Sequence, residues 1–116
     1  MKVTIQDRTL VFSIEVVRLI RQLPRSVESD ILRKQIIRSS TSIGANIREA
    51  QSGSSKREFL QYMQIALRSA RETEYWLEIL SQLELLSIEP SMKLLQENQE
   101  ISRILTAILR TGKRNS

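Results

Sequence analysis

The sequence contains neither cysteine nor histidine. Without cysteine there is no disulfide framework, and without either residue the usual ligand sets for zinc, haem and iron–sulfur clusters are missing. Histidine is also the commonest general base, so a serine beside lysine or a carboxylate is the only conceivable nucleophilic pair. We therefore expect no metal site, no cofactor and no enzymatic activity.

Glycine and proline are scarce, with three glycines and two prolines in 116 residues. So few breaks favour long, uninterrupted helices. The glycines, Gly44, Gly53 and Gly112, lie far apart, and none is followed by the Gly-Lys-Ser/Thr sequence of a phosphate-binding loop. A nucleotide site built on a glycine-rich loop is therefore not expected.

Long hydrophobic runs are also absent. No segment approaches the roughly 20 apolar residues of a membrane span, and the N-terminal segment lacks the apolar core of a signal peptide. Hydrophobic residues make up 41% and charged residues 27% of the chain, which is ordinary for a soluble globular protein. We expect a single domain over residues 1–116 and, by default, a cytoplasmic location.

Hydrophobic periodicity predicts four helices. Pro24 should end the first, because the residue before a proline avoids the helical region. Gly112 should follow the end of the fourth and leave a frayed tail. The predicted helices cover about residues 7–23, 27–51, 56–86 and 88–110.

Short polar segments between these helices supply capping signals. Ser26 or Ser29 can cap the second helix, and Ser87 the fourth. The sequence "SKRE", from Ser55 to Glu58, fits a capping box that opens the third helix. Because the connections are short, the helices should pack as an all-α, up-down-up-down antiparallel four-helix bundle.

Two apolar faces remain after a bundle core has been assigned. They are too large to stay in contact with water, since contiguous exposed apolar patches usually mark interfaces. We therefore predict a homo-oligomer built through these faces, with Tyr62 and Trp76 as aromatic helix-contact candidates. The faces comprise Leu10, Ile14 and Val17 on the first helix, and Tyr62, Ile65, Trp76, Ile79 and Leu83 on the third.

The net charge of +5 favours a polyanionic partner. The second helix places Lys34, Arg38 and Arg48 in one line, and Lys56 and Arg57 open the third helix. These five residues are the candidates for contact with RNA or DNA, with structured RNA as the leading hypothesis. Two alternatives stay open: a solvated face with salt bridges, and a protein-interaction scaffold that does not bind nucleic acid.

A further surface group lies on the third helix. Arg68 and Arg71 can contact phosphate, and Tyr75 can stack on a base. No aromatic-rich platform accompanies them, so sequence-specific readout is not indicated. On the fourth helix, Arg103 and Arg110 are interpreted as plain solvent-facing surface.

The stretch "SSTSIGANIREAQSGSS" contains many weak helix formers. Its isoleucines continue the core stripe, so we still expect helix. Gly44 lies at the edge of that stripe, where the missing side chain lets another helix approach. Ser42 and Asn46 should hydrogen-bond across a helix contact, and Glu49 could brace the same junction by pairing with an arginine.

The run "IRSSTSIGANIREAQSGSSKREFLQYMQIALRSARETEYWLEIL", residues 37–80, resembles the bacterial four-helix bundle proteins of the 23S rRNA intervening sequence. The leading "LVFSIEVVRLIRQLP" and the closing "LSIEPSMKLLQENQEISRILTAILR" are also similar, so the resemblance spans nearly the whole chain. Its motif residues are Ser42, Gly44, Ala45, Asn46, Glu49, Ala50, Ser55, Phe59, Ile65, Ala66, Ala70, Glu72, Thr73, Tyr75, Trp76 and Leu77.

The resemblance implies a left-turning up-down bundle that assembles as a pentameric ring. Similar bundles are the accessory variability determinants of diversity-generating retroelements, in which a basic pentamer engages RNA and a reverse transcriptase. This chain resembles the intervening-sequence branch more closely, because the accessory branch lacks the "GANIREA" and "ETEYWL" segments. RNA binding is thus implied by analogy.

Overall fold

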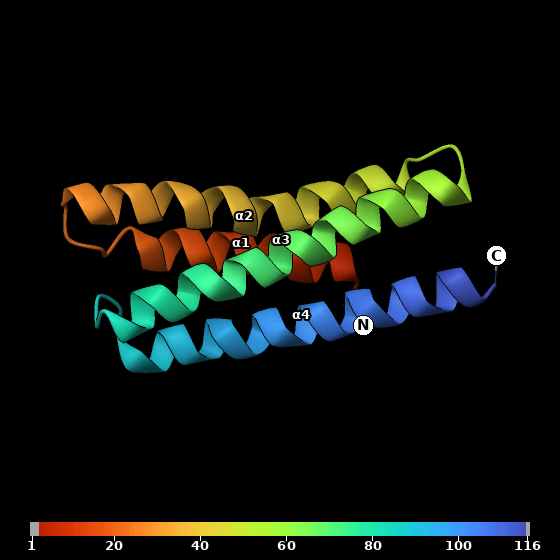
Figure 1. The fold of residues 1–116 in the computed structure, drawn as a ribbon. Coiled ribbons are helices and arrows are strands. Elements are labelled where there is room, and N and C mark those ends of the chain that lie inside the picture. The colour runs from red at the N-terminus through yellow and green to blue at the C-terminus, as the bar shows by residue number, and fades with distance from the viewer. Residues whose placement is uncertain (1–2, 116) are drawn as a thin grey trace.

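A computed structural model describes residues 3–115, which fold into four antiparallel α-helices (Figure 1). The helices pack in sequence order, and α4 also returns to α1, in a bundle of 47 × 28 × 22 Å. The predicted all-α four-helix bundle is confirmed. Among the described residues, no helix is long and apolar enough to cross a membrane. The helices are α1 (Ile5–Ile20), α2 (Val27–Gln51), α3 (Lys56–Gln82) and α4 (Ile88–Arg114).

Helix α1 is shifted toward the N-terminus relative to the prediction. Thr4 caps it, because its side chain accepts a hydrogen bond from the Asp7 amide (3.1 Å). The helix ends at Ile20 and not at Leu23, and a short turn follows in which the Leu23 amide donates to the Ile20 carbonyl (3.1 Å). This turn keeps Leu23 buried in the core although it lies outside the helix.

Helix α2 has the predicted bounds, and Ser26 is its cap: the hydroxyl oxygen accepts from the Ser29 amide (3.0 Å). Ser55 caps α3 in the same way by accepting from the Glu58 amide (3.1 Å). Both helices therefore begin where a serine satisfies an amide that has no partner within the helix.

Helix α3 ends at Gln82, four residues before the predicted end at position 86. Glu84 adopts a left-handed backbone conformation with φ 59°, and the Leu85 amide turns back to the Leu80 carbonyl (3.1 Å). This arrangement usually uses glycine, because a side chain there costs roughly 1–2 kcal/mol. The sequence carries no glycine at this point, so the helix end had no visible signal.

Gly112 does not end α4, which continues to Arg114. A Cβ atom at Gly112 would lie 2.5 Å from Leu60 Cδ2, so the glycine lets α4 pack closely on α3. The predicted fraying from Thr111 is wrong for residues up to Arg114, while Ser116 lies outside the described residues. Ser87 occupies the N-cap position of α4 but its side chain makes no capping hydrogen bond.

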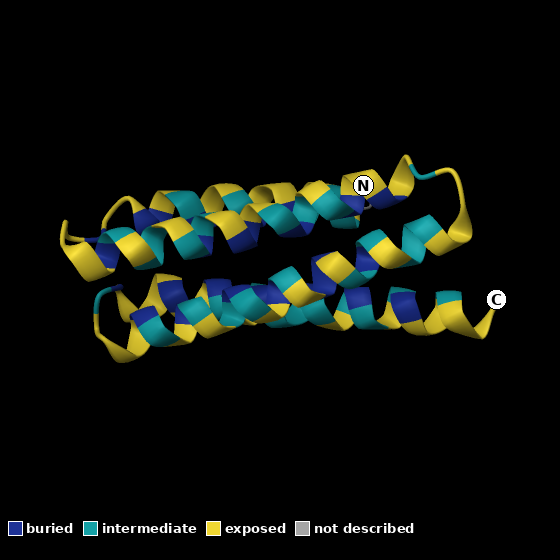
Figure 2. Cartoon of the chain, turned by 45° about the horizontal axis from the view of Figure 1, so that its top comes forward, coloured by how far each residue is buried: buried dark blue, intermediate teal, exposed yellow. Residues whose placement is uncertain are grey.

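The core lies between the four helices, where the buried faces are turned toward one another (Figure 2). Each fully buried aliphatic or aromatic side chain contributes roughly 1.5–3 kcal/mol. On the outer face of α1, Leu10 and Ile14 remain 46% and 41% exposed. The largest fully buried hydrophobic side chains are Phe12, Val16, Ile20, Ile36, Ile43, Ile47, Met63, Leu77, Leu80, Ile101 and Leu105.

Candidate nucleic-acid interface

Hydroxyl side chains join α2 to α3 along the stretch rich in weak helix formers. The Ser69 hydroxyl donates to Ser42 Oγ (3.0 Å), and the Thr73 hydroxyl donates to Ser39 Oγ (2.8 Å). Ser39 and Thr73 are completely buried. The expectation for Ser42 is therefore correct, and its partner Ser69 could not be identified from the sequence.

Asn46 hydrogen-bonds within its own helix, and the bond that was expected from it across a helix contact is absent among residues 3–115. Its Nδ2 donates to the carbonyl and the hydroxyl oxygen of Ser42, at 2.8 and 2.9 Å. Asn46 thereby fixes the Ser42 side chain that receives Ser69 from α3. Glu49 is exposed, and its carboxylate forms no ion pair with residues 3–115, so the expected pairing with an arginine is absent there.

Gly44 faces α1, as its position at the edge of the core stripe predicted. A Cβ atom there would lie 3.0 Å from Thr9 Oγ1 and 3.4 Å from Thr9 Cβ. Thr9 is completely buried, and its hydroxyl donates to the Ile5 carbonyl (2.9 Å). The missing side chain of Gly44 therefore makes room for Thr9.

The aromatic helix-contact candidates both lie half-buried against the core. Trp76 Nε1 donates to Glu72 Oε2 (2.9 Å), and the same carboxylate oxygen pairs with the Arg38 guanidinium of α2. No hydrogen bond of the Tyr62 side chain occurs within the described part of the chain. Trp76 thus supports a link between α2 and α3, whereas Tyr62 contributes apolar packing.

The Arg38–Glu72 pair changes the interpretation of Arg38 as a phosphate-binding candidate. Arg38 also donates to the Gln35 side chain (2.9 Å), so its guanidinium has two protein partners. Glu72 lies on α3, so this ion pair joins α3 to α2. A guanidinium that is already neutralised offers less to a phosphate than a free one.

The four other candidate cations are exposed: Lys34, Arg48, Lys56 and Arg57. Their side chains form no ion pair or hydrogen bond with any described residue. Lys34 and Arg48 are fourteen residues apart on α2, a separation of about 21 Å along the axis. Arg48 lies near the turn that leads to Lys56 and Arg57, so three of the four cations gather at one end of the bundle (Figure 1).

The α3–α4 hairpin separates charge along its length. Its open end joins the first half of α3, with Lys56, Arg57, Arg68 and Arg71, to the last part of α4, with Arg103, Arg110, Lys113 and Arg114. The closed half, residues 72–100, carries one cation, Lys93, and seven carboxylates. These carboxylates are Glu72, Glu74, Glu78, Glu84, Glu89, Glu97 and Glu100.

The structure brings together two arginines that the sequence assigned separately. Arg71 of α3 and Arg110 of α4 line the same groove, which has a volume of about 380 Å³. The sequence indicates only plain surface at Arg110, because helical periodicity within α4 cannot reveal which residues of α3 lie opposite. Only antiparallel packing places the two side chains at one groove.

Ion pairs hold other cations of the bundle. Burial disfavours the charged form of Asp30, but hydrogen bonds and charges from Arg33 and Arg25 outweigh this and lower the pKa of Asp30. Arg8 donates two hydrogen bonds to Glu97, at 2.9 and 2.7 Å, and they raise the pKa of Arg8 against the opposing effect of burial. Arg8 thus connects α1 to α4, whereas Arg25 and Arg33 hold Asp30 near the start of α2, and all three arginines are occupied within the protein.

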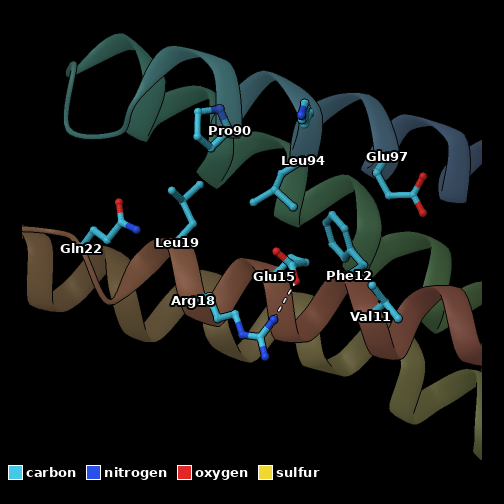
Figure 3. A pocket seen from close by; sticks show the side chains of 10 residues that line it. Val11, Phe12, Glu15, Arg18, Leu19, Gln22, Pro90, Leu94 and Glu97 are labelled. Carbon is cyan, nitrogen blue, oxygen red and sulfur yellow. Dashed lines mark hydrogen bonds and ion pairs between the residues drawn. The ribbon is translucent and has the colours of Figure 1, made fainter.

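A more apolar groove of about 420 Å³ lies between α1 and α4 (Figure 3). Leu19 from α1 and Leu94 from α4 point into it, and the Glu15–Arg18 ion pair (3.1 Å) lies on its α1 side. Val11 at the same groove is 58% exposed. This surface suits an apolar contact, in contrast to the basic end of the α3–α4 hairpin.

Comparisons with known proteins agree on one family. A family model described as 23S rRNA-intervening sequence protein matches residues 1–107. Among solved structures, the chain is similar to a protein of unknown function from the S23 ribosomal protein family of Bacteroides thetaiotaomicron. The two share 39% sequence identity and a TM-score of 0.85, over 91% of this chain and 98% of the other. A search of curated proteins finds no match.

Proposed function

This chain belongs to the 23S rRNA-intervening sequence protein family, and from that premise we propose that it is a non-enzymatic cytoplasmic protein that binds structured RNA. The family that the sequence motifs indicated is therefore confirmed. The binding surface that we propose consists of Lys34 and Arg48 on α2 with Lys56 and Arg57 at the start of α3, and we call it the α2 surface. Arg38 lies on it but is neutralised by Glu72.

One observation carries the proposal: four exposed cations of the α2 surface have no partner among residues 3–115. Free cations bind phosphate by releasing counterions from the nucleic acid, which gives affinity without base recognition. The family description refers to 23S rRNA, and that of the solved relative to a ribosomal protein family. RNA is therefore a more specific expectation than a polyanion in general.

We further propose that the protein assembles as a homo-oligomer through the outer faces of α1 and α3, where Leu10, Ile14 and Ile65 are exposed. The resemblance implies a ring of five copies. Each copy would add an α2 surface, so that several weak phosphate contacts act together.

The experiment measures binding of a fluorescently labelled RNA hairpin by anisotropy at 50 and 200 mM salt. The variant Arg48→Gln/Lys56→Gln should bind about tenfold more weakly at low salt. Its plot of log affinity against log salt should be less steep by about 0.7–0.9 for each phosphate that the variant no longer binds. The matched control, Arg18→Gln/Lys93→Gln, removes the same charge elsewhere and should bind like the wild type.

Undetectable hairpin binding at low salt, or equal affinities for the wild type and the α2-surface variant, would overturn the proposal. The competing function is a protein-interaction scaffold that does not bind nucleic acid, which the exposed apolar groove between α1 and α4 favours. Purified oligomer that carries a stoichiometric protein partner and shows no nucleic-acid absorbance would support this second function.

A further inference from the structure

The groove between α3 and α4 has a basic lining contributed by both helices. Gln64 and Arg71 line it from α3, and Thr106, Arg110 and Lys113 line it from α4. A second hollow of about 370 Å³ continues along the same seam, and Arg71, Thr106 and Arg110 also line that hollow. Arg71 of α3 and Arg110 of α4 therefore line both hollows.

No carboxylate is among the described residues that line the first groove. The second hollow does contain a carboxylate, Glu74, which accepts from the Gln99 amide (2.9 Å), whereas Glu100 further along the seam pairs with Arg103 (2.8 Å). Arg71 and Arg110 form no ion pair within residues 3–115. In the first groove the two guanidinium groups share a lining whose described residues include no carboxylate, and a bound anion there would relieve their repulsion.

The hydrogen-bond donors in the groove favour a phosphate over a carboxylate. Thr106 donates its hydroxyl proton to the Ser102 carbonyl (2.8 Å), so this proton is not available to a ligand. The free donors are the two guanidinium groups and the Gln64 amide, which has no hydrogen bond to any described residue. A carboxylate is matched by one guanidinium fork, whereas the several oxygens of a phosphate can accept from donors on opposite walls.

Tyr75 adds a surface that would recognise a nucleotide base. It lies four residues after Arg71, on the same side of α3, and 58% of it is exposed. Its ring packs against Trp76, with ring centroids 5.3 Å apart and an interplanar angle of 59°. Tyr75 lines neither hollow, so its ring would stack on a base that follows the bound phosphate along the strand.

We propose that the α3–α4 groove binds a phosphate group of single-stranded RNA through Arg71 and Arg110, with a neighbouring base stacked on Tyr75. The inference rests on the proposed function for RNA as the source of the phosphate. It does not depend on the α2 surface, since the two sites share no residue. A free phosphate ion offers the same chemistry without the base.

The test uses a labelled oligouridylate of about 12 nucleotides and the full chain, with binding followed by anisotropy at several salt concentrations. Arg71→Gln/Arg110→Gln should bind about tenfold more weakly, with a salt dependence less steep by about 0.7 for each phosphate released. Tyr75→Leu should also weaken oligouridylate binding. The control Arg18→Gln/Lys93→Gln should match the wild type, and circular dichroism should show all variants folded.

A second measurement adds inorganic phosphate and follows the Nε–H resonances of Arg71 and Arg110 by NMR. We expect phosphate to shift both resonances in the wild type and equally in Tyr75→Leu. If phosphate shifts both resonances but the protein does not bind oligouridylate, the groove is an anion site and RNA is not the source of its phosphate. Unshifted resonances together with unchanged oligouridylate affinity in the double variant would overturn the site itself.

This result is separable from the test of the α2 surface. Loss of hairpin binding in Arg48→Gln/Lys56→Gln says nothing about the groove, because neither residue lines it. Conversely, a groove variant that binds like the wild type would leave the hairpin result intact. The two proposals can therefore fail independently.

Discussion

At the scale of single residues, a small side chain matters most where two helices approach closely. Gly44 faces Thr9, which is completely buried and held by its bond to the Ile5 carbonyl. Thr9 therefore cannot turn aside for a larger neighbour. The glycine lowers the helix propensity of α2 by about 1 kcal/mol relative to alanine, and close packing against α1 offsets this cost.

The substitution Gly44→Leu should lower the free energy of unfolding by about 1–3 kcal/mol, because the added atoms overpack the contact with Thr9. Urea denaturation followed by circular dichroism measures the change. The matched control is Ala45→Leu at the next, exposed position, which should change stability by less than about 0.5 kcal/mol. Equal stability of the two variants would show that Gly44 does not limit the approach of α1.

At the scale of secondary-structure elements, α2 and α3 are joined by polar contacts in an otherwise apolar seam. Ser39 and Thr73 are buried at its centre, Ser42 and Ser69 form a second link, and the Arg38–Glu72 pair lies at its edge. A buried polar group is costly unless it is hydrogen-bonded. Ser39 and Thr73 also have carbonyl partners within their own helices, at Ile36 and Ser69, so the strength of the link between α2 and α3 has to be measured by coupling the two side chains.

A double-mutant cycle tests this link. Ser39→Ala and Thr73→Val should each cost about 1 kcal/mol, and the double variant should cost less than their sum by about 0.5–1.5 kcal/mol. Denaturant unfolding of the four proteins gives the coupling. Thr41→Ala with Thr106→Val is the control cycle, because each hydroxyl bonds only to its own helix. Additive effects in the Ser39–Thr73 cycle would contradict an energetic link between α2 and α3.

At the scale of the whole molecule, the bundle leaves an apolar outer face on α1. Leu10, Ile14 and Val17 line a groove of about 440 Å³ there, and Thr41 of α2 forms part of its edge. This face was expected from the sequence, and exposed apolar patches of this kind mark interfaces. Oligomerisation stays a prediction, and the outer face of α1 is where it can be tested.

The variant Leu10→Lys/Ile14→Lys should reduce the assembly to monomers, because a contact there would bury unpaired charges. Size-exclusion chromatography with light scattering gives the mass, and circular dichroism should show the helix content unchanged. Val27→Lys/Ile31→Lys, two exposed apolar residues at the start of α2, is the control and should assemble normally. A wild-type protein that is monomeric at micromolar concentration would contradict the oligomer.

Much of the fold could be predicted because its signals are local. Apolar residues recur with helical spacing, and Ser26 and Ser55 each cap a helix only three residues away from the amide that they satisfy. The exposed cations of the α2 surface were visible for the same reason, since α2 places Lys34 and Arg48 in line and the next two, Lys56 and Arg57, open α3 a few residues later. Predictions were weakest where a local signal was missing or ambiguous, as at Glu84 and Gly112.

The sequence by itself determined the four helices, their inward faces and the excess of positive charge, because each depends on residues within a few turns of one another. Tertiary structure decided which cations are occupied and which converge. Arg38 meets Glu72, and Arg71 shares a groove with Arg110, only because their helices pack side by side. Such partners are 34 and 39 residues apart in the chain. Their meeting is set by the packing of whole helix faces, which no local pattern encodes.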